Sequence, residues 1–329
     1  MPFTSISESL GHYLRIKVPY LTNLAVLAIE RIEGGWEGDV FAFDLSFLDN
    51  GTAQTRPMIL KLYQEPGLEL LGQRHTREFE ALRQLNNEGY PAPDVYLLEC
   101  DSCYLGKPFV IMERVAGARL DKLLEQYSPT EREARYGEMC KLFVRLHSLD
   151  WQNFTALGDL PAVESAIDRE LQRFLQIGLA AGASYAEPAL AWLWQRASSV
   201  TGSRLALAHW DFHAGNILCD SHGKLSVLDW CGAGVTDCRF DLAWSTLFLG
   251  DFAPKFIALY AELAGHPVDD FDFFLAFAYL RRILSITISL QHSPEFLGMR
   301  AEAAEHMHLQ QHRLHALHNQ WLGLTGVRL

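Results

Sequence analysis

The stretch that decides the fold covers residues 205–230 and reads LALAHWDFHAGNILCDSHGKLSVLDW. Three short apolar segments in it have the residue types of β-strands: 205–208, 217–219 and 225–228. A polar loop from His209 to Asn216 separates the first two segments, and Asp229 directly follows the third. If the last two segments pair as a hairpin, Asp229 returns to the side of Asn216. The sequence therefore predicts one polar site that holds Asn216 and Asp229 together.

The polar residues of this stretch have the spacing of a catalytic loop for phosphoryl transfer. His209, Asp211 and Asn216 fit the pattern H-x-D-x-x-x-x-N, and Asp229 stands where kinases have a metal-binding aspartate. Phosphoryl transfer needs a carboxylate that positions the acceptor hydroxyl and oxygen ligands for Mg²⁺. We assign Asp211 to the first role and Asn216 and Asp229 to the second. The alternative is a polar loop in which these side chains only cap turns.

A lysine closes an apolar strand in the first third of the chain. Met58-Ile59-Leu60-Lys61 is similar to the V-A-I-K strand whose lysine binds the α and β phosphates of a nucleotide. A lysine at a strand end can also be a solvated edge residue. Here a helix follows, and either Glu78 or Glu80 in it can hold Lys61 forward as an ion-pair partner.

The overall pattern changes from strands to helices along the chain. Strands are expected at 26–32, 40–47, 57–63, 95–98 and 108–112, with helices at 6–16 and 74–85. Helices are expected thereafter at 120–125, 130–149, 163–177, 188–199, 240–249, 254–264, 269–291 and 300–322. Sheet first and helices second predict an α+β fold with two lobes. We place the N-terminal lobe at 1–112, a hinge at 113–117 and the helical C-terminal lobe at 118–329.

Several motifs together resemble the aminoglycoside phosphotransferase and choline kinase superfamily, and more loosely the protein kinases. They are Leu60-Lys61, residues 77–82, Pro91-Ala92-Pro93, Ile111-Met112-Glu113, Leu146-His147, residues 209–218, Asp229-Trp230 and Asp241-Leu242-Ala243. The resemblance implies a bilobal protein kinase-like fold whose N-terminal lobe binds ATP or GTP with Mg²⁺. It also favours Glu78 over Glu80 as the partner of Lys61.

The same resemblance assigns further residues. The backbone carbonyl of Glu113 and the backbone amide of Val115 are the expected contacts of the adenine at the hinge. Asp241 matches an aspartate that supports the catalytic loop. Gly35 lies in the expected phosphate-covering loop, although that loop does not fit the G-x-G-x-x-G of protein kinases. Trp210 departs from the glycine that most family members have after the loop histidine.

Two histidines of the loop are expected to have structural roles. His209 should organise the loop through hydrogen bonds instead of acting as a base, and His213 either approaches the acceptor or lines the loop. The chain lacks the catalytic-loop arginine and the activation segment of protein kinases. Regulation by loop phosphorylation is therefore not expected.

Composition restricts the class of partner and compartment. The chain has 329 residues, 49% of them hydrophobic, and a formal net charge of -12. This charge opposes binding to nucleic acid or an anionic membrane and favours a cationic or neutral small substrate. The first residues lack the basic start and apolar run of a secretory signal, so we expect a cytoplasmic protein. The apolar segment 271–290 contains Asp272, Arg281 and Arg282, which favours a buried helix over a membrane span.

Other polar clusters have simpler explanations. Cys100 and Cys103 have no second pair at zinc-ligand spacing, and the histidines of the last helix have no fixed carboxylate or cysteine partner. Acidic residues near the expected acceptor side could attract an amine or simply begin a helix; they are Asp269, Asp270, Asp272 and Glu295.

The sequence therefore predicts an ATP- or GTP-dependent kinase that phosphorylates a hydroxyl of a small molecule. Aminoglycoside, macrolide, choline or ethanolamine, and sugar or amino-alcohol acceptors all stay open, as does the oligomeric state, because a fold does not determine a substrate. The alternative is a nucleotide-binding pseudokinase that works as a sensing or partner-binding module.

Overall fold

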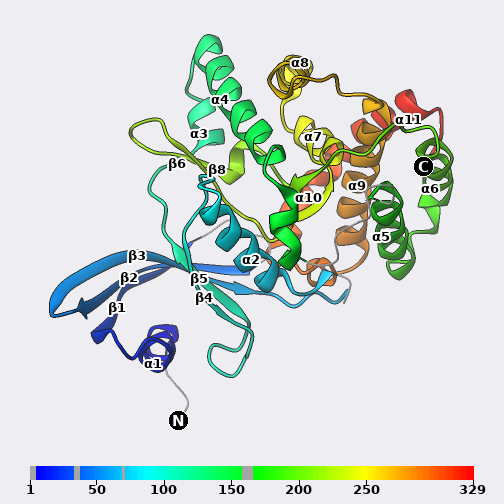
Figure 1. The fold of residues 1–329 in the computed structure, drawn as a ribbon. Helices are drawn as coiled ribbons and strands as arrows, with labels where there is room; N and C mark the ends of the chain where they lie inside the picture. The colour runs from blue at the N-terminus through cyan, green and yellow to red at the C-terminus, as the bar shows by residue number, and fades with distance from the viewer. Residues whose placement is uncertain (1–4, 33–37, 69–70, 158–165) are drawn as a thin grey trace.

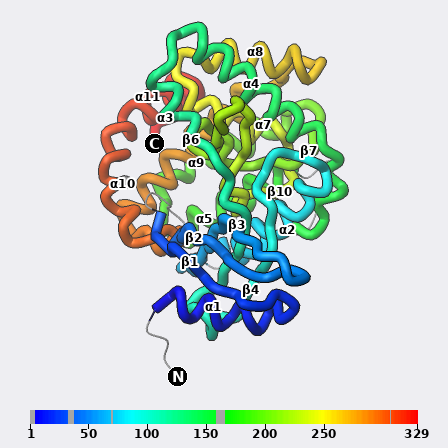
Figure 2. Tube along the Cα trace, turned by 90° about the vertical axis from the view of Figure 1, so that its left-hand side faces the viewer, coloured from blue at the N-terminus to red at the C-terminus, as the bar shows by residue number. Residues whose placement is uncertain are grey.

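The computed structural model describes residues 5–32, 38–68, 71–157 and 166–329. Its two lobes lie at opposite ends of the molecule in two perpendicular views (Figure 1, Figure 2). An antiparallel sheet forms the first lobe and helices form most of the second. The α+β fold predicted from the sequence is confirmed.

The sheet of the first lobe has the strand order β1-β2-β3-β5-β4. Its strands are β1 (Thr22–Ile32), β2 (Gly38–Asp49), β3 (Thr52–Tyr63), β4 (Val95–Glu99) and β5 (Phe109–Glu113). Strand β3 begins at Thr52 instead of the predicted residue 57, because its exposed first half pairs with β2 as far as the turn. Residues 52–57 do not alternate between apolar and polar side chains, so hydrophobic periodicity could not predict them as part of the strand.

The two faces of this sheet pack against different helices. Alternate residues such as Leu60 and Phe109 pack with α1 (Ile6–Lys17), whereas Tyr63 and Val110 pack with α2 (Arg74–Asn87). Successive side chains of a strand point to opposite faces, so one strand contributes to both cores. Helix α2 therefore lies between the sheet and the helical lobe (Figure 1).

The second lobe is built around a long apolar helix, α9. Its helices are α3 (Leu120–Leu124), α4 (Pro129–His147), α5 (Ala166–Ala180), α6 (Glu187–Ala197), α7 (Cys238–Thr246), α8 (Ala253–Ala264), α9 (Phe271–Gln291), α10 (Ala303–Gln310) and α11 (Leu314–Thr325). Helix α9 packs against α6, α7, α10 and α11. It is long and apolar enough to cross a membrane, but 61% of its most apolar window is buried inside the protein.

The structure corrects three expectations for this lobe. Strands β6 (Ala118–Arg119) and β10 (Gly234–Asp237) were not predicted. Such short strands are stabilised by their partners, β8 (Ile217–Cys219) and β7 (Leu205–Ala208) respectively, and not by a pattern of their own. A 3₁₀ segment at Trp151–Leu157 was also missed. The predicted single helix 300–322 is two helices, α10 and α11, joined by a 3₁₀ turn at Gln311–Arg313.

The connection after β5 contacts the hairpin that follows the predicted catalytic loop. Gly117 has a φ of +146°, and a Cβ there would lie 2.7 Å from the backbone oxygen of Cys219. The next residue, Ala118, is paired with Cys219 through β6 and β8. Only glycine combines this backbone conformation with this close approach. The expected hinge is therefore held directly against the site described next.

Candidate active site

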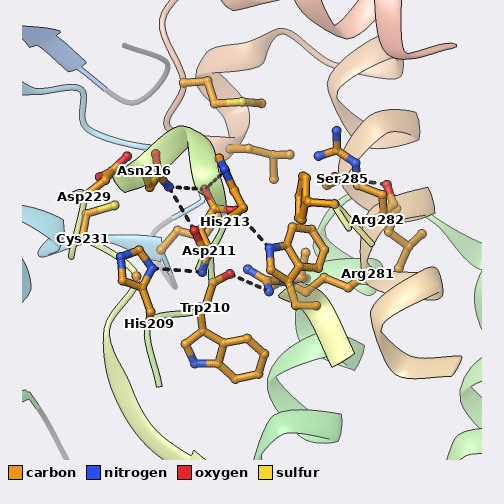
Figure 3. A pocket seen from close by; sticks show the side chains of 18 of the residues that line it. His209, Trp210, Asp211, His213, Asn216, Asp229, Cys231, Arg281, Arg282 and Ser285 are labelled. Atoms are coloured by element: carbon orange, nitrogen blue, oxygen red, sulfur yellow. Dashed lines mark hydrogen bonds and ion pairs between the residues drawn. The ribbon is translucent and has the colours of Figure 1, made fainter. Parts of the chain in front are cut away.

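The predicted loop lies between three short strands. Strand β7 (Leu205–Ala208) leads into it, and β8 (Ile217–Cys219) pairs with β9 (Leu225–Val227) as a hairpin. Beyond the hairpin, the amide of Leu228 donates to the carbonyl of Asn216 at 2.8 Å. The hairpin thus returns Asp229 to the side of Asn216, as the sequence predicted, and Figure 3 shows the two side chains together.

A buried aspartate fixes the start of the loop. The carboxylate of Asp241, at the first turn of α7, accepts hydrogen bonds from the amides of His209 at 2.6 Å and Trp210 at 2.8 Å. Nδ1 of His209 accepts from the amide of Asp211, so its Nε2 carries the hydrogen and donates to the carbonyl of Leu228 at 2.9 Å. Asp241 and His209 therefore make the hydrogen bonds that their predicted supporting roles require.

Asp211 is held by donors on both of its oxygens. Nε1 of Trp244 donates to Oδ1 at 3.0 Å and Nδ2 of Asn216 donates to Oδ2 at 3.0 Å. Nε2 of His213 lies 3.4 Å from the same Oδ2, so His213 contacts Asp211 as well as lining the loop. Burial alone would raise the pKa of Asp211, but hydrogen bonds from His213 and Trp244 hold it well below its usual range. Asp211 is therefore an oriented carboxylate.

The atoms available for a metal are oxygens of Asn216 and Asp229. Because the amide nitrogen of Asn216 donates to both the carboxylate and the backbone carbonyl of Asp211, its amide oxygen is the atom left for a cation. Asp229 has a φ of +64°, a left-handed backbone conformation that residues other than glycine adopt mainly where the surrounding structure requires it. An amide oxygen and a carboxylate fit Mg²⁺, which usually takes few protein ligands and completes its shell with phosphate and water.

Lys61 joins the two lobes at this site. Its Nζ lies 2.7 Å from Oε2 of Glu78 on α2 and 2.8 Å from Oδ1 of Asp229. Burial alone would lower the pKa of Lys61, but Asp229 and Glu78 outweigh it and raise the pKa well above its usual value. Glu78 also accepts from the hydroxyl of Tyr63 and from the amide of Trp230. The structure thus pairs Lys61 with Glu78, the partner chosen on the resemblance.

The remaining predicted nucleotide contacts lie apart from this cluster. Glu113 ends β5, where its amide donates to the carbonyl of Asp94 at 2.8 Å, and Val115 lies in the connection toward β6. Their roles in holding adenine stay predictions. Gly35 lies outside the described residues.

Two of the four acidic residues singled out in the sequence, Asp269 and Asp270, have structural partners. Asp269 pairs with Arg204 at 2.5 Å, and the carboxylate of Asp270 accepts from the amide and hydroxyl of Thr201. Asp270 also lies 3.9 Å from Arg239. These contacts anchor the start of α9 to the segment before β7, so these two aspartates belong to the packing of the lobe.

Sequence reasoning missed the tryptophan and the arginines that line the cavity beside Asp211. Trp244 lies on α7, Arg173 on α5, and Arg281 and Arg282 on α9. No motif marks them, since they come from three helices distant in the sequence. Hydrophobic periodicity predicts the helices that carry these residues, but it does not predict that they line the same cavity.

Comparisons with known proteins show the family of this chain. The model of the phosphotransferase enzyme family matches residues 28–277. Acyl-CoA dehydrogenase family member 10 of Mus musculus is 30% identical over 251 residues, which are 68% of this chain and 23% of that protein. The chain therefore corresponds to less than a quarter of the length of this relative.

Solved structures share the fold at low sequence identity. A Ralstonia eutropha protein, provisionally described as an aminoglycoside phosphotransferase, has a TM-score of 0.66 at 21% identity, covering 91% of this chain and 95% of its own. An ethanolamine kinase of Plasmodium vivax has a TM-score of 0.63 at 14% identity, covering 94% and 86%. A thermostable variant of aminoglycoside phosphotransferase APH(4)-Ia, in a ternary complex with ADP and hygromycin B, has a TM-score of 0.58 at 17% identity, covering 92% and 99%. The match to the family model, together with a kinase-like fold, shows that the chain belongs to the phosphotransferase enzyme family.

Proposed function

We propose that this protein is an ATP- or GTP-dependent kinase that transfers the terminal phosphate of the nucleotide to a hydroxyl of a small molecule. The observation that carries the proposal is that Lys61 pairs with Asp229 and Asn216 with Asp211, and that the backbone bond from Leu228 to Asn216 holds these two pairs side by side. Phosphoryl transfer depends mainly on positioning and charge stabilisation, and this set has the required donors and oxygens. The neighbours solved with ADP and hygromycin B, or named as ethanolamine kinase, support a nucleotide and a hydroxylated acceptor.

In the proposed reaction, Lys61 contacts the nucleotide phosphates, and Glu78 keeps its ammonium group in place. Asn216 and Asp229 would hold Mg²⁺, which neutralises charge on the phosphates. Asp211 accepts a hydrogen bond from the acceptor hydroxyl and orients its oxygen toward the terminal phosphorus. The new oxygen–phosphorus bond forms as the bond to the nucleoside diphosphate breaks, and the hydroxyl proton passes to Asp211.

The low pKa of Asp211 suits this role. A carboxylate that is ionised at the start of the reaction accepts a hydrogen bond from the hydroxyl, and a loose transition state requires little help from a strong base, so the proton moves to Asp211 only late in the transfer. Trp244 and His213 orient both oxygens of the carboxylate, so the acceptor meets a fixed geometry.

The test combines nucleotide binding with transfer. ATP and GTP, each with and without Mg²⁺, should raise the melting temperature in a Mg²⁺-dependent way for the nucleotide that is used. Asp211→Ala should keep this stabilisation and reduce transfer to a hydroxylated acceptor on the order of a thousandfold, equivalent to about 4 kcal/mol. Asp229→Ala should lose the Mg²⁺-dependent part of the stabilisation.

Two results would reject the proposal in different ways. Full transfer activity in Asp211→Ala would reject the assigned role of that residue. No stabilisation of the wild type by either nucleotide at millimolar concentration would favour the alternative, a binding module built on the same fold.

A further inference from the structure

A cavity of about 530 Å³ extends from Asp229 past Asp211 to helix α9. Figure 3 shows Asp229 and Asn216 on one side of Asp211, and Arg281 and Arg282 on the other. The cavity has the size of sites that bind small organic molecules, roughly 300–1,000 Å³. In the proposed function, its part beyond Asp211 is the space for the acceptor.

The cavity is strongly basic although the chain is acidic. Seven of the described residues that line it are arginines: Arg74, Arg77, Arg119, Arg173, Arg281, Arg282 and Arg313. Only three acids accompany them among the described residues of the lining: Glu170, Asp211 and Asp229. The local charge is therefore opposite in sign to the formal net charge of -12.

Each of the three acids already has partners of its own. Asp229 is paired with Lys61 at 2.8 Å, and Glu170 lies 3.1 Å from Arg169. Asp211 accepts hydrogen bonds from Trp244 and Asn216. The acids of the lining thus leave the arginines of α5 and α9 available to an anionic ligand.

Neutral groups hold the two arginines of α9 in place. Arg281 lies over the ring of Trp244 at 4.0 Å and the ring of Trp210 at 4.8 Å, and it donates to the carbonyl of Trp210 at 3.1 Å. Arg282 donates to Oε1 of Gln310 at 3.3 Å. Stacking between indoles fixes a guanidinium without neutralising it. Trp210, the residue that departs from the family's glycine, therefore positions a cation beside the catalytic loop.

Two further cations face the same space from α2 and α5. Within the described part of the chain, neither Arg77 nor Arg173 has a carboxylate within salt-bridge distance. Burial lowers the pKa of Arg77, and the nearby Arg173 lowers it further. Like charges that share a cavity repel each other, and a bound anion removes that repulsion.

The rest of the wall is apolar. It includes Phe174 and Ile177 of α5 and Phe277, Leu284 and Ile288 of α9. A ligand that fills this space buries hydrocarbon or aromatic surface while its polar groups meet the arginines and Asp211.

We propose that the acceptor is a hydroxylated molecule with an apolar body and an anionic group, a carboxylate or a phosphate ester, which the guanidinium groups of Arg173, Arg281 and Arg282 bind. Planar guanidinium groups match both anions through paired hydrogen bonds. The identification of this molecule as the acceptor rests on the proposed kinase function, whereas the anion site itself does not. A cationic aminoglycoside would meet charge repulsion here.

The anion site can be tested without any transfer reaction. Benzoate and phenyl phosphate serve as anionic probes, and benzamide and benzylamine as neutral and cationic ones. Binding is followed by quenching of tryptophan fluorescence, since Trp210 and Trp244 line the cavity. At least one anionic probe should bind the wild type more tightly than benzamide and benzylamine do. Whichever of the two anions binds more tightly shows whether the anionic group of the acceptor is a carboxylate or a phosphate ester.

Charge-removing variants localise the site. Arg173→Gln and Arg282→Gln should each weaken the anionic probe about tenfold, the order expected for a hydrogen bond between charged partners. Arg83→Gln is the matched control, because Arg83 is exposed on α2 and pairs with Glu80. Equal binding by these two variants and the wild type, or equal binding of benzamide and the anions, would overturn the proposal.

A final arm separates this site from the nucleotide site. Saturating Mg²⁺ and ADP should leave the anionic probe bound, whereas its displacement by ADP would overturn the proposal. If the anion binds in this way but no nucleotide does, the kinase function fails and the anion site stands. If transfer occurs to amino alcohols while the anions do not bind, the kinase function stands and the anionic acceptor fails.

Discussion

At the scale of single residues, the site depends on a buried ion pair. Glu78 is 1% exposed, and its carboxylate is satisfied by Lys61, Tyr63 and the amide of Trp230. Removing one member of a buried pair is costly because the other charge stays in a medium of low polarity. Lys61 thus has a structural role in addition to its proposed contact with phosphate.

Lys61→Met should lower the free energy of unfolding by about 3–5 kcal/mol, since Glu78 would lose its cation. The double variant Lys61→Met/Glu78→Gln should recover a large part of this loss, because glutamine removes the unpaired charge while its amide group can still bond the Trp230 amide and the Tyr63 hydroxyl. Urea denaturation without nucleotide measures both values. Equal losses in the single and double variants would contradict the role of the unpaired carboxylate.

The low pKa of Asp211 predicts a pH dependence of stability. Its folded pKa is below its ordinary value of 3.8, so the carboxylate contributes stability that is fully present above pH 5 and is lost as pH falls through the folded pKa. The difference in unfolding free energy between wild type and Asp211→Asn should therefore shift against the wild type as the pH falls below about 4. Urea titrations across this range measure it, and a difference that does not change below pH 4 would be inconsistent with the shift.

At the scale of elements, two glycines should respond to alanine in opposite directions. Gly117 needs its unusual φ and has backbone of Cys219 where a Cβ would lie, whereas Gly137 lies inside α4 and its Cβ would meet only Leu259 at 3.9 Å. Gly117→Ala should lower the free energy of unfolding by about 1–3 kcal/mol. Gly137→Ala should raise it by about 0.5–1 kcal/mol, because alanine loses less backbone freedom in a helix.

Thermal denaturation of both variants checks the comparison. Gly117→Ala should also weaken nucleotide-dependent stabilisation, because Gly117 is the last residue of the expected hinge and lies against the hairpin that follows the predicted catalytic loop. If both variants changed stability in the same direction, the explanation for Gly117 would be wrong.

At the scale of the whole molecule, the lobes also meet away from the hinge and from Lys61. The amides of Gly67 and Leu68 donate to the carbonyls of Glu295 and Phe296, at 3.0 and 3.1 Å. Arg74 at the start of α2 donates to the carbonyls of Leu297 and Gly298, at 2.7 and 3.0 Å. These bonds connect the first lobe to the segment after α9, on the cavity side of the molecule.

Arg74→Met should loosen this contact between the lobes. The amides of Gly67 and Leu68 should exchange with deuterium faster than in the wild type, because closing the lobes is what protects them. Arg83→Met, on the exposed side of the same helix, should leave the exchange unchanged. Slow exchange of both amides in Arg74→Met would show that the contact is held without this arginine.

The catalytic loop shows how far sequence reasoning can reach. Asp211, Asn216 and Asp229 lie in one stretch of 26 residues, 205–230, whose hairpin is a local feature, so spacing alone predicted their meeting. The partner of Lys61 needed the family resemblance, because both Glu78 and Glu80 lie on the same helix. Strands β6 and β10 could not be predicted from the sequence, since each is stabilised by a partner strand that is distant along the chain.

What the sequence alone determined is the two-lobed α+β fold and the meeting of Asn216 and Asp229 beside the loop, because hydrophobic periodicity and short motifs are local properties of the chain. What only the tertiary structure decided is the positive charge of the cavity. Arg173, Arg281 and Trp244 come from α5, α9 and α7, and packing of these helices brings their side chains to one place. The formal net charge of -12 is a sum over the whole chain, and it contains no information about which residues share a cavity.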